Sequence, residues 1–279
     1  MTDKFKLLPS NYDNIKKTKM ICDGPLSTKR NIKPPFINEC GFFMIIAGKP
    51  KSGKTTFVFD MLTNKDIYKK VFKNIIFVAP ENSRNSIENN PLADLDDEFL
   101  FNELNDDVKE QVLKNKEEYK KTPKKKYQQL LLIDDCTSHL KDMNNILMLN
   151  DLVFNRRHNS LCIILLTQYI TSIPASVRSQ YNGIVLFKPS KKDYERINKE
   201  FLFMKKNEFI DFVDFVFKDR HDNLFINSDL ENDYYKNLQK IIFTSNYIHA
   251  NKKTIENKTE SKTESNKETK EKPTKTINY

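Results

Sequence analysis

The chain has 279 residues, with 47 Lys or Arg against 38 Asp or Glu and a formal net charge of +9. This length is enough for one sizeable α/β core with appendages. No run of about 20 apolar residues is present and residues 1–6 do not have the pattern of a signal sequence, so we expect a soluble, intracellular protein without a membrane span.

The basic excess lies mainly at the two ends of the chain. Residues 1–40 contain eight Lys/Arg and four acids, and residues 251–279 contain eight and five, which leaves 31 basic and 29 acidic residues in the 210 between. The charge therefore does not by itself indicate nucleic-acid binding. Residues 120–126 are a basic exception, which either contacts phosphates or forms a solvated loop.

The first predicted strand leads directly into a glycine-containing loop. Residues 42–47 form an apolar run, and the loop that follows, Gly48-Lys49-Pro50-Lys51-Ser52-Gly53-Lys54-Thr55, fits the pattern G-x-x-x-x-G-K-[ST]. Residues 55–62, which follow the loop, contain apolar residues at helical spacing. The alternative is a glycine turn that only joins a strand to a helix.

Such a loop binds a polyphosphate through its backbone N–H groups and the N-terminus of the helix. Lys54 is expected to contact the β- and γ-phosphates, and the Thr55 hydroxyl is expected to bind Mg²⁺. We therefore predict a nucleoside triphosphate site at residues 48–56, with ATP and Mg²⁺ as the bound species.

Strand and helix signals alternate along the rest of the chain, as a parallel α/β sheet requires. Buried strands are expected at 74–80, 129–133, 161–166 and 183–188, and helices at 105–121 and 143–154. Residues 213–217 and 224–227 are expected to form a C-terminal β-hairpin around a turn at 219–223. The predicted fold is a P-loop NTPase with a RecA-like, mainly parallel sheet of about five strands flanked by helices.

Two carboxylates follow the strand at 129–133. Asp134 is expected to bind Mg²⁺, and Asp135 to orient and deprotonate an attacking water. Taken alone, the pattern also fits a helix N-terminus with aspartate caps. The phosphate loop about 80 residues upstream favours the metal site.

Polar and basic residues flank the strand at 161–166. Gln168 follows it, where an amide can contact both a γ-phosphate and a catalytic water; the alternative is a polar pair that only ends a strand. Arg156 and Arg157 precede this strand, and Arg178 precedes the next. One of these arginines is expected to stabilise charge on the nucleotide of a neighbouring subunit, and a surface or salt-bridged arginine is the competing interpretation.

Residues 152–168, 173–178 and 184–188 resemble the poxvirus-type genome-packaging ATPases of the FtsK/HerA superfamily. The similarity runs from about residue 35 to residue 227, and its most specific part is the Arg157-His158 step before the strand at 161–166. The resemblance implies an extra strand between the Walker A and Walker B strands, and a homo-oligomeric ring that pumps double-stranded DNA of any sequence into a capsid. The site residues that it implies are the nucleotide ligands Lys54 and Thr55, the Mg²⁺ acid Asp134, the catalytic acid Asp135, the sensor Gln168, and Arg178 or Arg157 acting in trans.

The same resemblance implies a capsid or vertex protein as partner, and a location in the viral factory of the host cytoplasm or in the virion. Two departures stand out. The superfamily often has Glu where this chain has Asp135, and relatives tend to have small residues where it has Lys49, Pro50 and Lys51.

The sequence also argues against two other functions. A GTPase would need an Asn-Lys-x-Asp motif, and residues 64–66 do not have its spacing. A terminase motor would need a nuclease domain that the residues after 190 are too few to form. A helicase or conjugation-type DNA pump, and a nucleotide-binding scaffold without turnover, remain open. We expect an extended basic arm over 1–40, an ATPase domain over 41–250, and a disordered low-complexity tail over 251–279.

Overall fold

The computed structural model describes residues 24–26, 31–121, 127–135, 140, 142–228, 230 and 233–243. The chain divides into two compact units, Met1–Gln239 and Lys240–Tyr279. The expected tail over 251–279 and the basic run at 122–126 lie outside the described residues. Among the residues described, no helix has the length and apolar character needed to cross a membrane.

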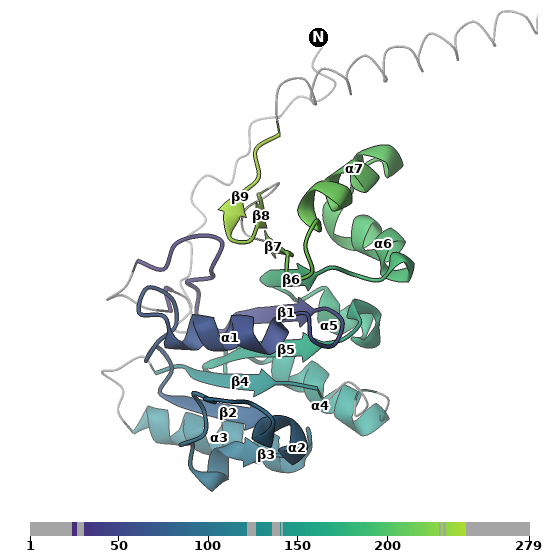
Figure 1. Cartoon of the computed structure of the whole chain (residues 1–279). Helices are drawn as coiled ribbons and strands as arrows, with labels where there is room; N and C mark the ends of the chain where they lie inside the picture. Colours follow the sequence, from purple (N-terminus) through teal and green to yellow (C-terminus); the bar gives the residue numbers. More distant parts are fainter. Residues whose placement is uncertain are drawn as a thin grey trace, which may run out of the picture. The chain divides into compact units, whose positions relative to one another are not determined.

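Strands and helices alternate from residue 43 onward (Figure 1). The strands are β1 Phe43–Ala47, β2 Asn74–Val78, β3 Leu100–Phe101, β4 Gln129–Ile133, β5 Leu161–Thr167, β6 Gly183–Phe187, β7 Asn223–Asn227, β8 Tyr234–Lys236 and β9 Gln239–Lys240. The α-helices are α1 Lys54–Thr63, α2 Glu81–Asn85, α3 Asp106–Lys120, α4 Met143–Phe154, α5 Ala175–Arg178, α6 Lys191–Ile197 and α7 Lys206–Val216. Short helical turns occur at Asp97–Phe99, Ile170–Ser172 and Asn198–Leu202, the last of them π-helical.

One nine-stranded sheet organises these elements, in the order β3-β2-β4-β5-β1-β6-β7-β8-β9. The strands from β3 to β6 are parallel, whereas β7 pairs antiparallel with β6 and with β8. Strand β5 lies between β1 and β4, with Ile45 opposite Leu165 on one side and Leu131 opposite Ile163 on the other. The P-loop fold class is therefore confirmed. The extra strand is confirmed as well: it is β5, which lies between the Walker A strand β1 and the Walker B strand β4.

Helices cover both faces of the sheet. Crossovers between parallel strands are right-handed, so α1, which leads from β1 towards β2, lies on one face, and α3, α4 and α5, which lead in the opposite direction, lie on the other. Contacts of α4 with both α3 and α5 agree with this arrangement. The central parallel strands β1, β4, β5 and β6 are mostly apolar and fully buried because both of their faces are covered.

The predicted C-terminal hairpin is wrong in its first strand. Residues 213–216 belong to α7, where Phe209, Phe212, Val213 and Val216 are buried at helical spacing. Phe215, which a strand would place on the same face as Val213, is 49% exposed while Val213 is 4% exposed. The antiparallel hairpin is formed instead by β7 and β8, because the apolar period across 206–216 is that of a helix.

The residues just before β1 pack into the core. Ile32 and Ile37, from the segment that we assigned to the arm, are buried against the sheet. The buried Tyr68 hydroxyl accepts a hydrogen bond from Ile37 N at 3.1 Å and donates one to Ile37 O at 3.0 Å. Tyr68 also stacks on Phe42, with ring centroids 5.5 Å apart. This tyrosine therefore joins the segment before β1 to the core under the sheet.

Replacing Tyr68 by phenylalanine should lower the free energy of unfolding by about 1–3 kcal/mol, because the buried N–H and C=O of Ile37 both lose their side-chain partner. Urea denaturation measures the change. Tyr119→Phe is the matched control, since the buried Tyr119 hydroxyl has no hydrogen-bond partner within the described part of the chain and its loss should be neutral or slightly stabilising. Equal stabilities of the two variants would contradict this account.

Candidate nucleotide site

The loop at residues 48–53 has the backbone of a phosphate loop. Gly53 precedes α1 with φ 104°, a conformation that side chains rarely allow. A Cβ at Gly48 would lie 2.6 Å from Phe187 Cβ, so only glycine fits there. Gly48 N also donates a hydrogen bond to Thr167 O at 3.1 Å, which joins the start of the loop to the end of β5.

The side chains of the loop differ in exposure. Lys49, Pro50 and Lys51, which stand where relatives tend to have small residues, are exposed. Their larger side chains therefore point to solvent and do not crowd the loop. Ser52 is 7% exposed, and its Oγ has no hydrogen-bond partner among the described residues. Among the described residues, no side chain caps the backbone N–H groups at the start of α1. These N–H groups can therefore donate hydrogen bonds to an anion bound at the helix N-terminus.

Lys54, Thr55 and Asp134 converge above this loop. Thr55 Oγ1 donates a hydrogen bond of 2.8 Å to Asp134 Oδ2. Lys54 Nζ donates to Gly48 O at 2.8 Å and to Lys49 O at 3.1 Å, so the ammonium group lies inside the loop. A hydroxyl and a carboxylate in direct contact, beside a lysine in a loop of N–H groups, fit a Mg²⁺-polyphosphate.

Burial shifts the pKa values of both charged groups. Desolvation lowers the pKa of Lys54, and the charges of Asp134 and Asp135 oppose that shift. Desolvation raises the pKa of Asp134, and the hydrogen bond from Thr55 and the charge of Lys54 oppose it. Each ion thus stabilises the charged form of the other in a partly dry site.

Asp135 and Gln168 meet at the same edge of the sheet. Gln168 Nε2 donates to Asp135 Oδ1 at 3.3 Å, and Ser83 Oγ of α2 lies 3.5 Å from Asp135 Oδ2. Asp135 has φ 55°, a left-handed conformation that aspartate adopts more readily than most residues. These contacts bring together the two side chains predicted to act on water.

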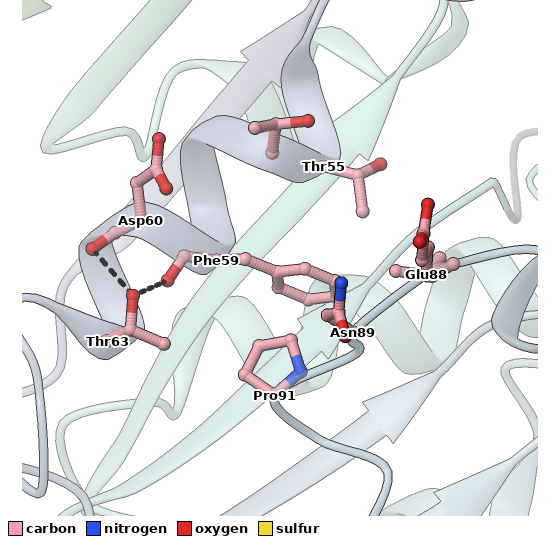
Figure 2. Close-up of a pocket in the computed structure, with 9 residues that line it drawn as sticks. Thr55, Phe59, Asp60, Thr63, Glu88, Asn89 and Pro91 are labelled. Atoms are coloured by element: carbon pink, nitrogen blue, oxygen red, sulfur yellow. Dashed lines mark hydrogen bonds between the residues drawn. The ribbon is translucent and has the colours of Figure 1, made fainter.

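Two neighbouring pockets open beside α1. The smaller one, of about 220 Å³, is lined by Lys54, Thr55, both aspartates, Gln168 and the α2 segment. The larger one, of about 470 Å³, shares Thr55 and Ile87 with it, but its charged side chains are the carboxylates of Asp60 and Glu88 (Figure 2). A polyphosphate therefore fits the smaller pocket, which contains the lysine.

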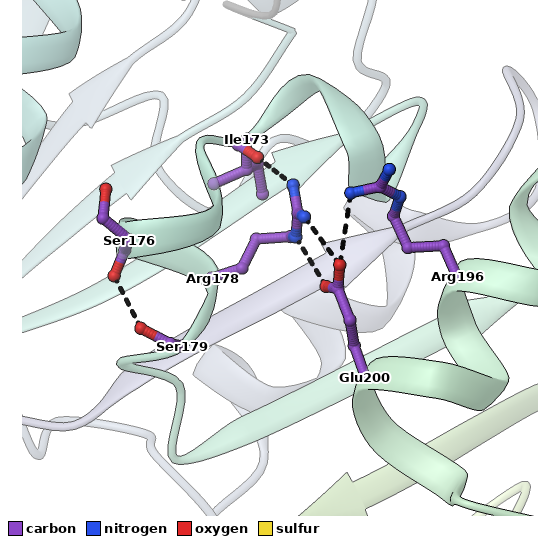
Figure 3. Close-up of polar contacts among 6 residues, drawn as sticks. All are labelled: Ile173, Ser176, Arg178, Ser179, Arg196 and Glu200. Atoms are coloured by element: carbon purple, nitrogen blue, oxygen red, sulfur yellow. Dashed lines mark hydrogen bonds and ion pairs between the residues drawn. The ribbon is translucent and has the colours of Figure 1, made fainter.

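Arg178, a candidate to act in trans, lies inside its own subunit. It is 3% exposed, and its Nε and one terminal nitrogen each donate to Glu200 at 2.9 Å. Its other terminal nitrogen donates to Ile173 O (Figure 3). Arg196 contacts the same Glu200 at 3.3 Å. This buried bidentate pair favours a structural role for Arg178 over one that requires an accessible guanidinium.

Arg156 and Arg157 lie where β5 begins, at the edge of the sheet opposite to the site. Arg156 Nε donates to Gly41 O at 2.8 Å, and its terminal nitrogens contact Val153 O, Gln180 O and Asn182 Oδ1. Arg157 is exposed. Of the three arginines, Arg157 is thus the most exposed.

Sequence reasoning missed two neighbours of the site. Ser83 of α2 lies beside Asp135, and His221, from the turn before β7, lies 3.1 Å from Ser52 O. Neither belongs to a motif, and both reach the site through contacts between distant segments. The chain-order signals that identify a phosphate loop cannot detect such contacts.

The model of the family described as Poxvirus A32 protein matches residues 35–267. A curated relative, the uncharacterized protein 015R of Frog virus 3 (isolate Goorha), is 24% identical over 160 residues, which cover 55% of this chain and 46% of that protein. The chain thus spans about half the length of the curated relative that it matches.

Among solved structures, the chain is similar to B204, the DNA-packaging ATPase from Sulfolobus Turreted Icosahedral Virus, with 18% identity, a TM-score of 0.49, and coverage of 73% of this chain and 99% of that one. B204 of Sulfolobus turreted icosahedral virus 2 in complex with AMPPCP has 18% identity, a TM-score of 0.48, and coverage of 70% and 96%. The pCW3 conjugation coupling protein TcpA with ATPγS has 12% identity, a TM-score of 0.45, and coverage of 74% and 62%.

Replacing Arg178 by alanine should destabilise the fold by about 1–3 kcal/mol, because the Glu200 carboxylate and the Ile173 carbonyl lose a buried donor. Arg196→Ala is the matched control, since Arg196 is exposed and contacts the same carboxylate; its cost should be about 0–1 kcal/mol. Urea denaturation of both variants measures the difference. An Arg178→Ala variant of wild-type stability that has lost nucleotide hydrolysis would instead support the trans-acting role.

Proposed function

The chain belongs to the poxvirus A32 protein family, and from this premise we propose that it is an ATP-driven motor that moves double-stranded viral DNA into a preformed capsid. The observation that carries the chemical part is the convergence of Lys54, Thr55, Asp134, Asp135 and Gln168 on one pocket. The DNA part rests on the family and on the resemblance of residues 152–188 to genome-packaging ATPases.

Binding of ATP would use the loop and the two residues that follow it. Backbone N–H groups of the loop and of the first turn of α1 would donate to the phosphate oxygens, and Lys54 would exchange the carbonyls of Gly48 and Lys49 for the β- and γ-phosphates. Thr55 and Asp134, already 2.8 Å apart, would hold Mg²⁺ between them and the phosphates. When bound, Mg²⁺ neutralises charge that develops on the phosphoryl oxygens.

Hydrolysis would depend on Asp135 and Gln168. The Asp135 carboxylate would accept a proton from a water aligned with the γ-phosphate, while the Gln168 amide would hold that water from the neighbouring strand end. Their hydrogen bond of 3.3 Å supports this proposal, because two groups so close together can contact the same water. This arrangement supports turnover, which distinguishes the proposal from a scaffold that only binds nucleotide.

The assembled motor would be a homo-oligomeric ring. Arg157 is exposed at the edge opposite to the nucleotide pocket, so in a ring this edge would face a neighbouring subunit and Arg157 would stabilise charge on the nucleotide of that subunit. The DNA would pass without sequence preference, and a capsid or vertex protein would receive the motor in the viral factory of the host cytoplasm or in the virion. A helicase or conjugation-type pump shares the same chemistry and differs in the partner that anchors the ring.

Lys54→Ala should abolish Mg²⁺-dependent ATP hydrolysis and weaken ATP binding, because the pocket loses the ammonium group that would contact the phosphates. Asp135→Asn should still bind ATP but turn over at least about 10²-fold more slowly, because it loses the proton acceptor. Phosphate release and nucleotide titration measure the two effects. Asp60→Asn, in the neighbouring pocket, is the matched carboxylate control and should behave as wild type. Wild-type turnover in Lys54→Ala would refute the site.

Double-stranded DNA of any sequence should stimulate the ATPase, because a packaging motor grips the phosphate backbone and not the bases. The apparent affinity should fall steeply with salt as the benefit of counterion release is lost. Removal of residues 251–279, which hold eight Lys/Arg and five acids, should weaken this affinity without abolishing turnover. ATPase rates titrated with duplexes of different sequence at two salt concentrations test this. If DNA changes neither the rate nor the oligomeric state at low salt, the packaging function falls.

A further inference from the structure

The turn between α7 and β7 lies directly against the phosphate loop. His221 Nδ1 is 3.1 Å from Ser52 O, and a Cβ built on Gly53 would be 3.6 Å from the same nitrogen. β7 runs antiparallel to β6, so the turn that precedes β7 lies at the edge of the sheet where β6 ends. His221 thus contacts the nucleotide loop from outside the five-residue cluster described above.

The chemistry of this contact determines its direction. A carbonyl oxygen only accepts hydrogen bonds, so His221 Nδ1 must carry the proton. In a planar trans peptide the oxygen and the hydrogen lie on opposite sides. Holding Ser52 O towards His221 therefore turns the N–H of Gly53 away from the imidazole.

That orientation is not fixed by the loop alone. Glycine populates positive and negative φ about equally, so the Ser52–Gly53 peptide has two accessible orientations at low cost. The Ser52 hydroxyl supplies no restraint, since its buried Oγ has no hydrogen-bond partner among the described residues. Lys54 restrains the loop at Gly48 and Lys49 instead.

The turn that carries His221 is itself held in place by Asp222, which is 5% exposed. Its carboxylate accepts hydrogen bonds from Asp219 N at 2.8 Å and Asn237 Nδ2 at 2.6 Å, and lies 3.1 Å from Lys236 Nζ. Burial alone would raise the pKa of Asp222, but these partners outweigh it and lower the pKa to about 2. His221 is therefore presented from a turn that is anchored to β8.

We propose that His221 is a positioning residue for the nucleotide, which selects the orientation of the Ser52–Gly53 peptide in which the Gly53 N–H is available to phosphate. This role rests on the proposed function, because it needs a polyphosphate in the loop. It also joins the turn before the β7–β8 hairpin to the phosphate loop through one hydrogen bond. A backbone donor that contacts phosphate equally before and during the reaction contributes uniform binding.

His221→Ala should therefore weaken binding of ATPγS about 10-fold and raise KM by a similar factor with kcat nearly unchanged, as expected for the loss of one hydrogen bond to a charged group. His221→Asn, whose amide nitrogen can take the place of Nδ1, should restore most of the affinity. A merely structural histidine would change the stability without this split between KM and kcat. Equal ATPγS affinity of wild type and His221→Ala would overturn the proposal.

A spectroscopic measurement on the nucleotide-free chain tests the contact independently. Nitrogen NMR of the His221 ring should show the proton on Nδ1, and a neutral ring protonated only on Nε2 would overturn the assignment. Binding of ATPγS by the wild-type chain distinguishes failure of the proposed function from failure of the role of His221. If wild type fails to bind ATPγS, the proposed function falls and the role towards phosphate falls with it, whereas binding by wild type with no loss in His221→Ala refutes the role of His221 alone.

Discussion

The hydrogen bond between Thr55 and Asp134 depends on the order of three strands. Thr55 lies in the first turn of the helix after β1, and Asp134 directly follows β4, which is separated from β1 by β5. The two side chains meet at 2.8 Å only because all three strands are parallel and their carboxyl ends reach the same edge of the sheet. The partly buried Lys54 and Asp134 then offset part of the desolvation cost of each other's charge. A change in strand order or register would separate Thr55 from Asp134 before it altered the loop itself.

The parts of the site that the sequence predicted are those whose signals are local. A glycine pattern between a buried strand and a helix, and two acids after a buried strand, can be recognised within about ten residues. The spacing of strands then supplies the rest, because parallel strands align their ends. The predicted five strands and the helices after β3 and β4 follow the same logic, since each is a continuous apolar or periodic segment.

What the sequence could not predict depends on contacts between distant segments. Arg178 resembles an accessible arginine in the sequence, yet Glu200, 22 residues later, buries and pairs it. His221 contacts a carbonyl 169 residues away. Four of the five residues at 213–217 are apolar, which fits a short strand, and only the buried face at Phe209 and Phe212 identifies the helix. In each case tertiary packing decides between two locally acceptable interpretations.

In the proposed function, ATP hydrolysis at this pocket drives movement along double-stranded DNA. Displacement of a third strand from a linear duplex tests it most directly, because a triplex-forming oligonucleotide is released only when a motor passes along the duplex beneath it. The wild-type chain should release the oligonucleotide with ATP and Mg²⁺, and replacing ATP by ATPγS or omitting Mg²⁺ should prevent the release. Hydrolysis of ATP in the presence of the duplex without any displacement would contradict it.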